Sequence, residues 1–404
     1  MTSLTPEQRR QRREERRRRI RRRRIGALAF STLALAGLFT GLTITGAFAG
    51  RDATRGGTSV AGTETTTTQS TSTAAQTTTT NKPKPKKKPR GRLGSGRPVT
   101  LAFGGDVHFE GIVRPKLDAD PASVFAPIAP VLKSADLAMV NLETTVSYGG
   151  SPTPGKTYTF RALPTAFRAL KDGGVDLATV ANNHGIDYGM SSFLDTLRYA
   201  KRYHFRLVGG GLNAAQAYAP YRVTIKGQRI AILAASQVID SNLIASWTAG
   251  PGKPGIASAY DVGRLTSAVR NARKNADTVV VYLHYGEERH SCPSSMQTRL
   301  ARSLVAAGAD IVVGSHAHRQ QGAGRLGQAF VDYGLGNFVW YSQNSVPSVT
   351  TGVLKVTVTG RRIDRYWWVP ATIVNGSPTP RTGSERTAAI SAWRSLRGCT
   401  GLRP

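Results

Sequence analysis

The 404-residue sequence contains only two cysteines, Cys292 and Cys399, and its first 98 residues contain no histidine. Neither cysteine has the sequence surroundings of a nucleophile or a metal ligand. In an exported protein the two cysteines are expected to form a disulfide that fixes the C-terminal tail to the core, whereas in the cytosol they are expected to stay reduced. The sequence does not place the two sulfurs near each other, so both alternatives stay open. No internal repeat is visible.

Charged residues are absent from Ile25 to Gly50, although residues 9–24 are nearly all arginine. An uncharged stretch of this length can cross a hydrocarbon core of about 30 Å as a helix. Arginines that precede such a helix stay in the cytosol. We therefore predict a cytosolic tail at 1–24, a transmembrane signal anchor at 25–49, and a main domain outside the cell. AFAG at 47–50 resembles a small-residue signal-peptidase site, so a signal peptide cleaved after Ala49 is the alternative.

Large apolar residues are nearly absent from the predicted linker, residues 50–97. From 63 to 98 the only apolar residues are alanines and Leu93, so this stretch cannot form a core. Its Pro/Lys part is a cationic spacer suited to contact with an anionic wall polymer, and an inert tether is the alternative. The first 98 residues hold 22 Lys and Arg against five Asp and Glu, so most of the net charge of +31 belongs to the tail. Because an apolar segment follows the arginines, we expect membrane association and no nucleic-acid partner.

From Pro98 the sequence changes to short apolar runs that alternate with amphipathic segments, as is typical of an α/β domain. The apolar runs that end in polar residues are 99–106, 135–143, 175–184, 277–286 and 309–318. Helices are expected at 191–203, 262–274 and 295–307, and hairpins at 221–236 and 352–370. This pattern predicts a sheet-rich sandwich flanked by helices over 98–375, followed by a C-terminal tail at 376–404.

Histidines concentrate where these apolar runs end. All seven histidines lie in the core, and five of them are at the end of a run. The polar residues at the five ends are Asp106 and His108, then Asn141 and Glu143, then Asn182, Asn183, His184 and Asp187, then His284, and finally His316 and His318. Because loops converge at the strand ends of such sheets, we expect a ligand site there.

Carboxylates, amide oxygens and imidazoles are ligands suited to Mn, Fe, Zn or Ni. The predicted set is large enough for two ions, which at a separation of about 3.5–4 Å can clamp a phosphoryl group and activate a water. On an extended backbone, positions i and i+2 point to the same side. His316 and His318 are therefore expected to face one metal cluster, and Asp106 and His108 are expected to do the same.

The ordered set of motifs resembles the calcineurin-like metallophosphoesterase superfamily and, within it, the CapA family of capsule or poly-gamma-glutamate biosynthesis proteins. The matching segments, in chain order, are GGDVHFEG, VNLETTVS, ANNHGIDYG, GGGLNAAQA, LHYGEE, AGADIVVGSHAHRQQG and YGLGNFVW. They span about residues 99–340. The resemblance implies a four-layer αββα sandwich and a metal-dependent, phosphoesterase-like hydrolase.

The resemblance also implies a role for each matching residue. The implied metal ligands are Asp106, His108 and His318 for one divalent ion (Mn, Fe or Zn), Asn183, His284 and His316 for a second, and Glu143 as the bridge. His184 would be the general acid that protonates the leaving oxygen, and Asp187 would orient it. The bridging residue is usually an aspartate, so the longer Glu143 leaves the metal spacing and the double occupancy open.

Several of these residues have alternative interpretations. The loop at Asn183 and His184 could instead cap the following helix, and Asn337 is expected to brace a loop, with substrate contact as the alternative. Departures from the family pattern are Gln216, Arg289 and Ser192, which bear on substrate identity more than on metal binding. The residues that could give the pocket mouth a positive field for an anionic ligand are Arg161, Arg289, His290 and Arg319. The alternative for these side chains is an ordinary solvated surface.

Two functions are consistent with the sequence. The first is an outward-facing metal-dependent hydrolase that acts on a phosphoester or an anionic envelope polymer. The second is a non-catalytic component of a capsule or poly-gamma-glutamate synthesis and export complex, in which the same fold binds polymer or partner subunits. A wall-binding module tethered by the linker is a weaker third interpretation, because it leaves the histidines unexplained.

Overall fold

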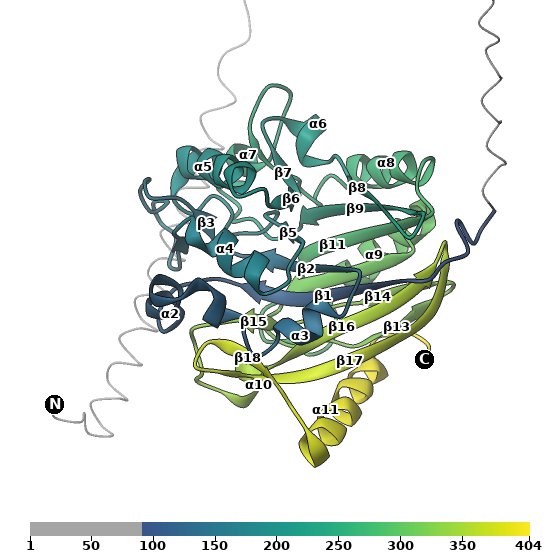
Figure 1. Ribbon diagram of the computed structural model, residues 1–404. Coiled ribbons are helices and arrows are strands. Elements are labelled where there is room, and N and C mark those ends of the chain that lie inside the picture. Colours follow the sequence, from purple (N-terminus) through teal and green to yellow (C-terminus); the bar gives the residue numbers. More distant parts are fainter. Residues whose placement is uncertain (1–90) are drawn as a thin grey trace, which may run out of the picture. The chain divides into compact units, whose positions relative to one another are not determined.

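The computed structural model describes residues 91–404, which fold around two β-sheets (Figure 1). The predicted cytosolic tail, the predicted signal anchor and most of the predicted linker fall in residues 1–90, outside the described residues. Within residues 91–404, no helix is both long enough and apolar enough to cross a membrane.

The larger sheet has eight strands in the described part of the chain. Seven follow the order β18-β17-β16-β1-β2-β5-β6, and β15 pairs with β1. Their bounds are β1 (Val99–Val107), β2 (Leu137–Leu142), β5 (Leu177–Thr179), β6 (Arg206–Val208), β15 (Asn337–Val339), β16 (Thr350–Thr359), β17 (Arg362–Val374) and β18 (Ser377–Pro380). β1, β2, β5 and β6 are parallel to one another, whereas β16 to β18 are joined in antiparallel fashion.

The smaller sheet has six strands among residues 91–404, in the order β13-β14-β12-β11-β9-β8. Their bounds are β8 (Tyr221–Ile225), β9 (Gln228–Ser236), β11 (Thr278–Tyr285), β12 (Ile311–His316), β13 (Ala323–Leu326) and β14 (Ala329–Asp332). The four central strands are parallel, and the two edge strands are antiparallel to their neighbours.

Helices and two short strand pairs fill the connections. The helices are α2 (Val113–Ala119), η1 (Pro121–Val124), α3 (Ala129–Lys133), α4 (Thr165–Asp172), α5 (Gly189–Arg202), α6 (Ala214–Ala217), α7 (Ile244–Trp247), α8 (Val262–Arg273), α9 (Ser295–Ala307), α10 (Val346–Val349), α11 (Gly383–Ser395) and η2 (Leu396–Cys399). The short pairs join β3 (Thr145–Val146) to β4 (Arg161–Ala162) and β7 (Gly210–Gly211) to β10 (Gly255–Ile256).

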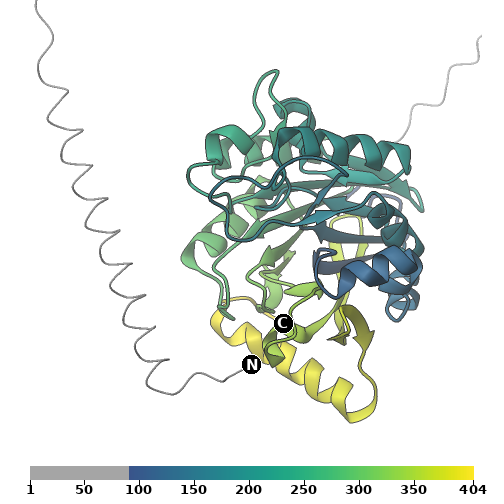
Figure 2. The same cartoon turned by 90° about the vertical axis from the view of Figure 1, so that its left-hand side faces the viewer.

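The two sheets pack face to face, and helices cover their outer faces (Figures 1 and 2). On β9, Ile230 and Ile232 belong to the core between the sheets, whereas the alternating Ala231 and Leu233 belong to a second core beneath α8 and α9. On the larger sheet, Tyr366 of β17 contacts Phe330 of β14 (ring centroids 4.5 Å apart), so this face meets the smaller sheet. The opposite face lies under α2, α3 and α4. The layers are therefore helix, sheet, sheet, helix, as expected for a sandwich.

Both predicted hairpins are confirmed. β8 and β9 are joined by Lys226 and Gly227, which have φ angles of +49° and +77°. Positive φ at both central residues is typical of the two-residue hairpin turn, whose twist matches that of the paired strands. β16 and β17 form the second hairpin, over 350–374.

The three predicted helices are confirmed as α5, α8 and α9. α9 has the predicted bounds because its ends carry strong signals: Ser294 and Gln297 form a reciprocal capping box at the start, and Gly308 ends the helix in the left-handed conformation. The other two predicted helices differ from the observed bounds by one or two residues at their ends.

Residues 376–404 continue the same domain beyond the predicted boundary at 375. β18 adds to the edge of the larger sheet, and α11 packs Trp393 flat on Trp368 of β17, with ring centroids 5.6 Å apart. Cys292 and Cys399 form a disulfide that joins the loop after β11 to η2. The C-terminal segment is therefore held to the core both by packing and by a covalent bond.

Asp332, at the end of β14, is a buried carboxyl that is expected to make the stability of the domain depend on pH. Its Oδ1 accepts a hydrogen bond from the Gly334 N–H at 3.0 Å, and its Oδ2 has no partner within the described residues. Burial raises the pKa of Asp332 well above its usual range. The stability that the protonated Asp332 carboxyl contributes is therefore fully present below about pH 4, where an unfolded aspartate is also protonated. This stability is lost as the pH rises through the raised pKa of the folded state.

The Asp332→Asn variant keeps an oxygen for the Gly334 N–H but cannot ionise. Between about pH 4 and about pH 8, we expect its free energy of unfolding to gain about 1–3 kcal/mol relative to the parent, because the folded parent must keep Asp332 protonated, or bury its charge, at a pH where the unfolded chain ionises freely. Urea denaturation at both pH values measures this difference, and Asp118→Asn, at an exposed position, is the control. A difference that does not change with pH contradicts the prediction.

Candidate metal centre

The carboxyl ends of five parallel strands meet between the two sheets. β1, β2 and β5 are neighbours in the larger sheet, and β11 and β12 are neighbours in the smaller one. At the end of β12 the N–H of His316 donates to Oδ2 of Asp106 near the end of β1, at 3.1 Å. This bond joins the two sheets, so the predicted convergence of polar strand ends is observed.

Gly105 allows the backbone to hold Asp106 in place. A Cβ atom at position 105 would lie 1.8 Å from the carbonyl oxygen of Gly336, a separation that no side chain tolerates. The Asp106 N–H donates to that same oxygen at 3.0 Å. Close approach of the two backbones therefore fixes the position of the Asp106 carboxylate.

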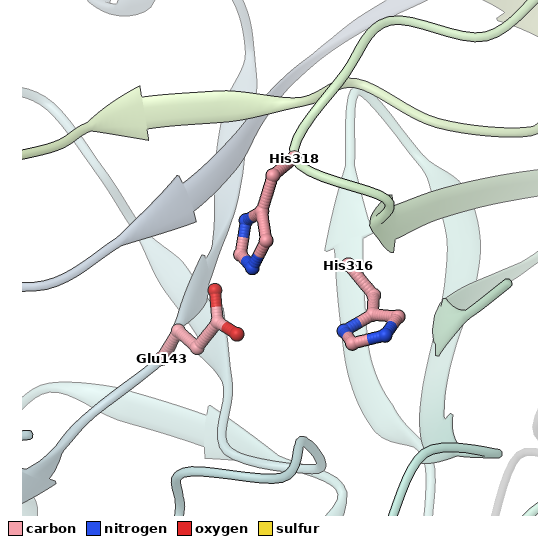
Figure 3. Close-up of side chains that lie close together, drawn as sticks. All are labelled: Glu143, His316 and His318. Carbon is pink, nitrogen blue, oxygen red and sulfur yellow. The ribbon is translucent and has the colours of Figure 1, made fainter. Parts of the chain in front are cut away.

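Two overlapping groups of side chains have the composition of metal sites. One consists of Glu143, His316 and His318, and Figure 3 shows the carboxylate directed toward the two imidazoles. The other consists of Asp106, Glu143 and His284. Within each group the potential ligand atoms lie within 4.8 Å of one another. Glu143 belongs to both groups, as a bridging ligand should.

Several buried polar atoms of this cluster have no hydrogen-bond partner among the described residues. They are both carboxylate oxygens of Glu143, Nε2 of His108 and Nδ1 of His316. Each unpaired buried polar atom costs about 1–3 kcal/mol, and more if it is charged. Divalent cations bound in the cluster would give these atoms partners, so the residues present fit a metal centre.

Burial and the close spacing of charged groups shift the pKa values within the cluster. Burial and the neighbouring negative charge of Asp106 raise the pKa of Glu143 well above its usual range. Burial tends to lower the pKa of His318, but the negative charges of Glu143 and Asp106 outweigh it and raise the pKa to about 9. Burial lowers the pKa of His284 to about 3, so this imidazole is neutral and able to bind a metal.

An amide chain behind the cluster orients its members. Nδ2 of Asn141 donates to Oδ1 of Asp106 at 2.8 Å, and Nδ2 of Asn182 donates to Oδ1 of Asn141 at 2.9 Å. Oδ1 of Asn182 in turn accepts from the N–H of His184 at 2.9 Å. Such outer contacts fix the direction of ligands and are expected to tune metal affinity.

His316 and His318 face the cluster together, but not for the reason that the sequence suggests. β12 ends at His316, and the φ angles of His316 and His318 are +96° and +51°. This left-handed backbone is strained for a residue with a side chain, and such strain is found mostly at functional sites. The extended geometry expected from the i, i+2 spacing is therefore wrong.

Asp106 and His108 also depart from simple strand alternation. β1 ends at Val107, and its pairing register shifts next to Asp106. His108 stacks on Phe160 with ring centroids 4.5 Å apart and lies outside both groups of three. Its Nδ1 accepts a hydrogen bond from the Glu110 N–H at 3.1 Å, so only Nε2 is left to bind an ion.

The loop after β5 brings three predicted residues to the edge of the cluster. Oδ1 of Asn183 lies 2.7 Å from Nε2 of His284, and Nδ1 of His184 lies 2.5 Å from Oδ2 of Asp187. Nε2 of His184 is 3.9 Å from Glu143 Oε1. The helix that follows, α5, has Tyr188 as its N-cap and no side-chain cap. The alternative that Asn183 or His184 caps this helix is therefore wrong.

Asn337 braces His318, which confirms its predicted bracing role. Its Oδ1 lies 2.9 Å from Nδ1 of His318, and its Nδ2 donates to the Ser348 carbonyl at 3.0 Å. A proton on Nδ1 leaves Nε2 of His318 free to bind an ion.

A pocket of about 520 Å³ opens beside the cluster. Its lining includes His184, His318, Trp340, Arg289 and Arg319. Of the other predicted rim residues, Arg161 lies over the ring of Tyr188, and His290 lies 3.7 Å from Glu287. Of the four predicted rim residues, Arg289 and Arg319 therefore line the pocket.

Two features of the site escaped the sequence analysis. Phe160 lies between the rings of His108 and His184, with centroids 4.5 and 4.3 Å away, and Lys156 forms an ion pair with Asp187 at 2.7 Å. Both belong to the loop between β3 and β4, which lacks the apolar run that marked the other site residues. The only available signal was an isolated lysine in a glycine- and proline-rich stretch.

The residues of the site lie in a part of the chain that matches a known protein family. Residues 100–342 match the family model described as "Bacterial capsule synthesis protein PGA_cap". This range contains all the candidate metal ligands and the loop that carries Lys156.

Three individual proteins show how far the similarity extends. Capsule biosynthesis protein CapA of Bacillus anthracis is 30% identical over 264 residues, which cover 65% of this chain and 64% of that protein. PGA biosynthesis protein CapA of Bacillus subtilis (strain 168) is 28% identical over 286 residues, covering 70% of this chain and 73% of that protein. A crystal structure of a hypothetical protein from Thermus thermophilus is 15% identical with a TM-score of 0.44, and covers 68% of this chain and 99% of that one.

Proposed function

Because the chain belongs to the bacterial capsule synthesis protein family, we propose that it takes part in making an anionic envelope polymer, as a metal-dependent hydrolase. Its substrate is a phosphoester or the polymer itself, either capsule or poly-gamma-glutamate. The observation that supports catalysis is the set of unpaired buried ligand atoms around Glu143, next to an open pocket and a His-Asp pair.

The ligand assignment follows the motifs. Asp106, His108 and His318 would hold one ion, Asn183, His284 and His316 would hold the second, and Glu143 would contact both. The ions would be divalent transition metals (Mn, Fe or Zn), which bind phosphoryl oxygens and lower the pKa of water. The shared position of Glu143 in both groups supports this arrangement.

His184 is the proposed general acid for the leaving oxygen. Its Nδ1 pairs with Asp187, so Nε2 is left toward the pocket, where it can donate a proton. Phe160 packs against the ring and restricts its rotation. Arg289 and Arg319 line the same pocket and favour an anionic substrate.

We propose that the domain works outside the cell, tethered by the segment at 25–49, where it meets envelope polymer and subunits of a capsule synthase. The Cys292–Cys399 disulfide supports an exported location, because such bonds rarely persist in the cytosol.

Hydrolysis of diphenyl phosphate by the full-length chain in detergent, with Mn²⁺ and with chelator, tests this function. We expect turnover only with the metal ion, and a loss of about 10²- to 10⁴-fold in His184→Asn, because general acid catalysis contributes that much. His204→Asn, at an exposed histidine outside the site, is the matched control. A folded parent that binds metal but hydrolyses neither this diester nor the polymer overturns the proposal and favours a role in complex assembly.

A further inference from the structure

Lys156 is a buried lysine next to the proposed acid. Its side chain is 7% exposed, and its Nζ lies 2.7 Å from Oδ1 of Asp187, a carboxyl that is fully buried. The same ammonium donates to the main-chain carbonyl of Asn183 and lies 4.9 Å from the ring centroid of Trp247. Lysine is almost never buried unless it is paired, because its charge loses water. The contacts of Lys156 must therefore compensate for the hydration that its charge has lost.

The contacts of Asp187 show what the lysine does. Oδ2 lies 2.5 Å from Nδ1 of His184 and accepts the Phe160 N–H at 2.7 Å. Oδ1 has no hydrogen-bond partner in the described part of the chain other than the ion pair with Lys156. The carboxylate plane is thus set by Lys156 on one side and by Phe160 on the other. The imidazole of His184 is aligned through that plane.

We propose that Lys156 is a positioning residue of the acid-base pair, which holds Asp187 so that His184 presents Nε2 to the pocket. This role rests on the proposed hydrolase function. The ammonium of Lys156 also contacts the main-chain carbonyl of Asn183, a proposed metal ligand. The same side chain therefore contacts both the acid-base pair and the loop that carries a metal ligand. Lys156 is not among the residues that line the pocket, so it acts through Asp187 and not on the substrate.

This role predicts a dependence on the leaving group. A basic leaving group such as phenolate needs a proton from His184, whereas p-nitrophenolate leaves readily without one. In Lys156→Met we expect kcat for diphenyl phosphate to fall about 100-fold and kcat for bis(p-nitrophenyl) phosphate to fall less than about tenfold. KM for both esters and the metal content are expected to stay close to those of the parent.

Three variants make the test specific. Lys156→Arg keeps the charge and is expected to recover much of the turnover of diphenyl phosphate. Asp187→Asn removes the partner and is expected to show the same preference for the nitrated ester, even if Lys156→Met does not fold. Lys253→Met is the matched control, because that lysine also donates to a main-chain carbonyl, that of Ala245, but has no carboxylate contact among the described residues.

The outcomes separate this inference from the proposed function. A parent that hydrolyses both esters while Lys156→Met or Asp187→Asn loses the two activities equally overturns only the positioning role. Loss of metal in Lys156→Met also overturns it, because the lysine then supports the ligands and not the acid. A metal-loaded parent that hydrolyses neither ester overturns the proposed function, and this inference with it.

Discussion

Replacement of Glu143 by glutamine is expected to weaken metal binding at least about a hundredfold and to abolish measurable hydrolysis. Glu143 belongs to both groups of potential ligands, and both of its oxygens are buried without a hydrogen-bond partner in the described residues. Glutamine keeps the size of the side chain but loses its charge. The loss would therefore come from the missing charge and not from a cavity.

The same substitution is expected to have opposite effects on stability with and without metal. Without metal, Glu143→Gln should raise the free energy of unfolding by about 1–3 kcal/mol, because the parent buries a carboxyl group whose oxygens have no hydrogen-bond partner among the described residues. With metal, the parent should be the more stable protein, since binding to the folded state adds to its stability. Thermal unfolding with Mn²⁺ and with chelator measures both effects. Glu385→Gln, exposed on α11, is the control, and an effect of the same sign in both conditions contradicts the metal role of Glu143.

Removal of the disulfide by Cys292→Ser and Cys399→Ser is expected to lower the free energy of unfolding by about 4 kcal/mol. The two cysteines are 107 residues apart, so the bond restricts a long loop in the unfolded chain. Turnover is expected to change little, because Gln321 also holds the loop that carries Arg289: its Nε2 donates to the carbonyls of His290 and Cys292.

Urea denaturation of the double variant and the parent, both without reductant, measures the contribution of the disulfide. A reduced parent should resemble the double variant, and a thiol assay should find two free cysteines only after reduction. Equal denaturation midpoints for oxidised parent and variant contradict the prediction.

Strand, helix and hairpin positions followed from local patterns. Buried parallel strands need continuous apolar runs, and the runs that end at Asp106, Glu143 and His284 marked three of them. Turn and cap residues such as Gly227 and Gly308 act within a few positions, so the ends of the hairpin strands and of the helix are set locally. The packing of 376–404 on the domain was missed, because Trp393 stacks on Trp368 across a contact that no local pattern encodes.

The site was predicted as a set of residues but not as a geometry. Polar residues at strand ends are visible in the sequence because the convergence of parallel strands follows from the fold class. The left-handed backbone at His316 and His318 was missed, since it depends on contacts between the two sheets. Lys156 was missed because its partner, Asp187, is 31 positions away and only the folded chain brings them together.

The central claim, that the cluster around Glu143 is a metal centre, is tested most directly by elemental analysis of the full-length chain purified after growth with Mn, Fe and Zn. We expect close to two divalent transition-metal ions per folded chain, lost in the double variant His316→Ala and His318→Ala, while the control variant His204→Asn keeps them. A folded parent that holds no such ion, and takes up none when Mn²⁺, Fe²⁺ or Zn²⁺ is supplied, would contradict it.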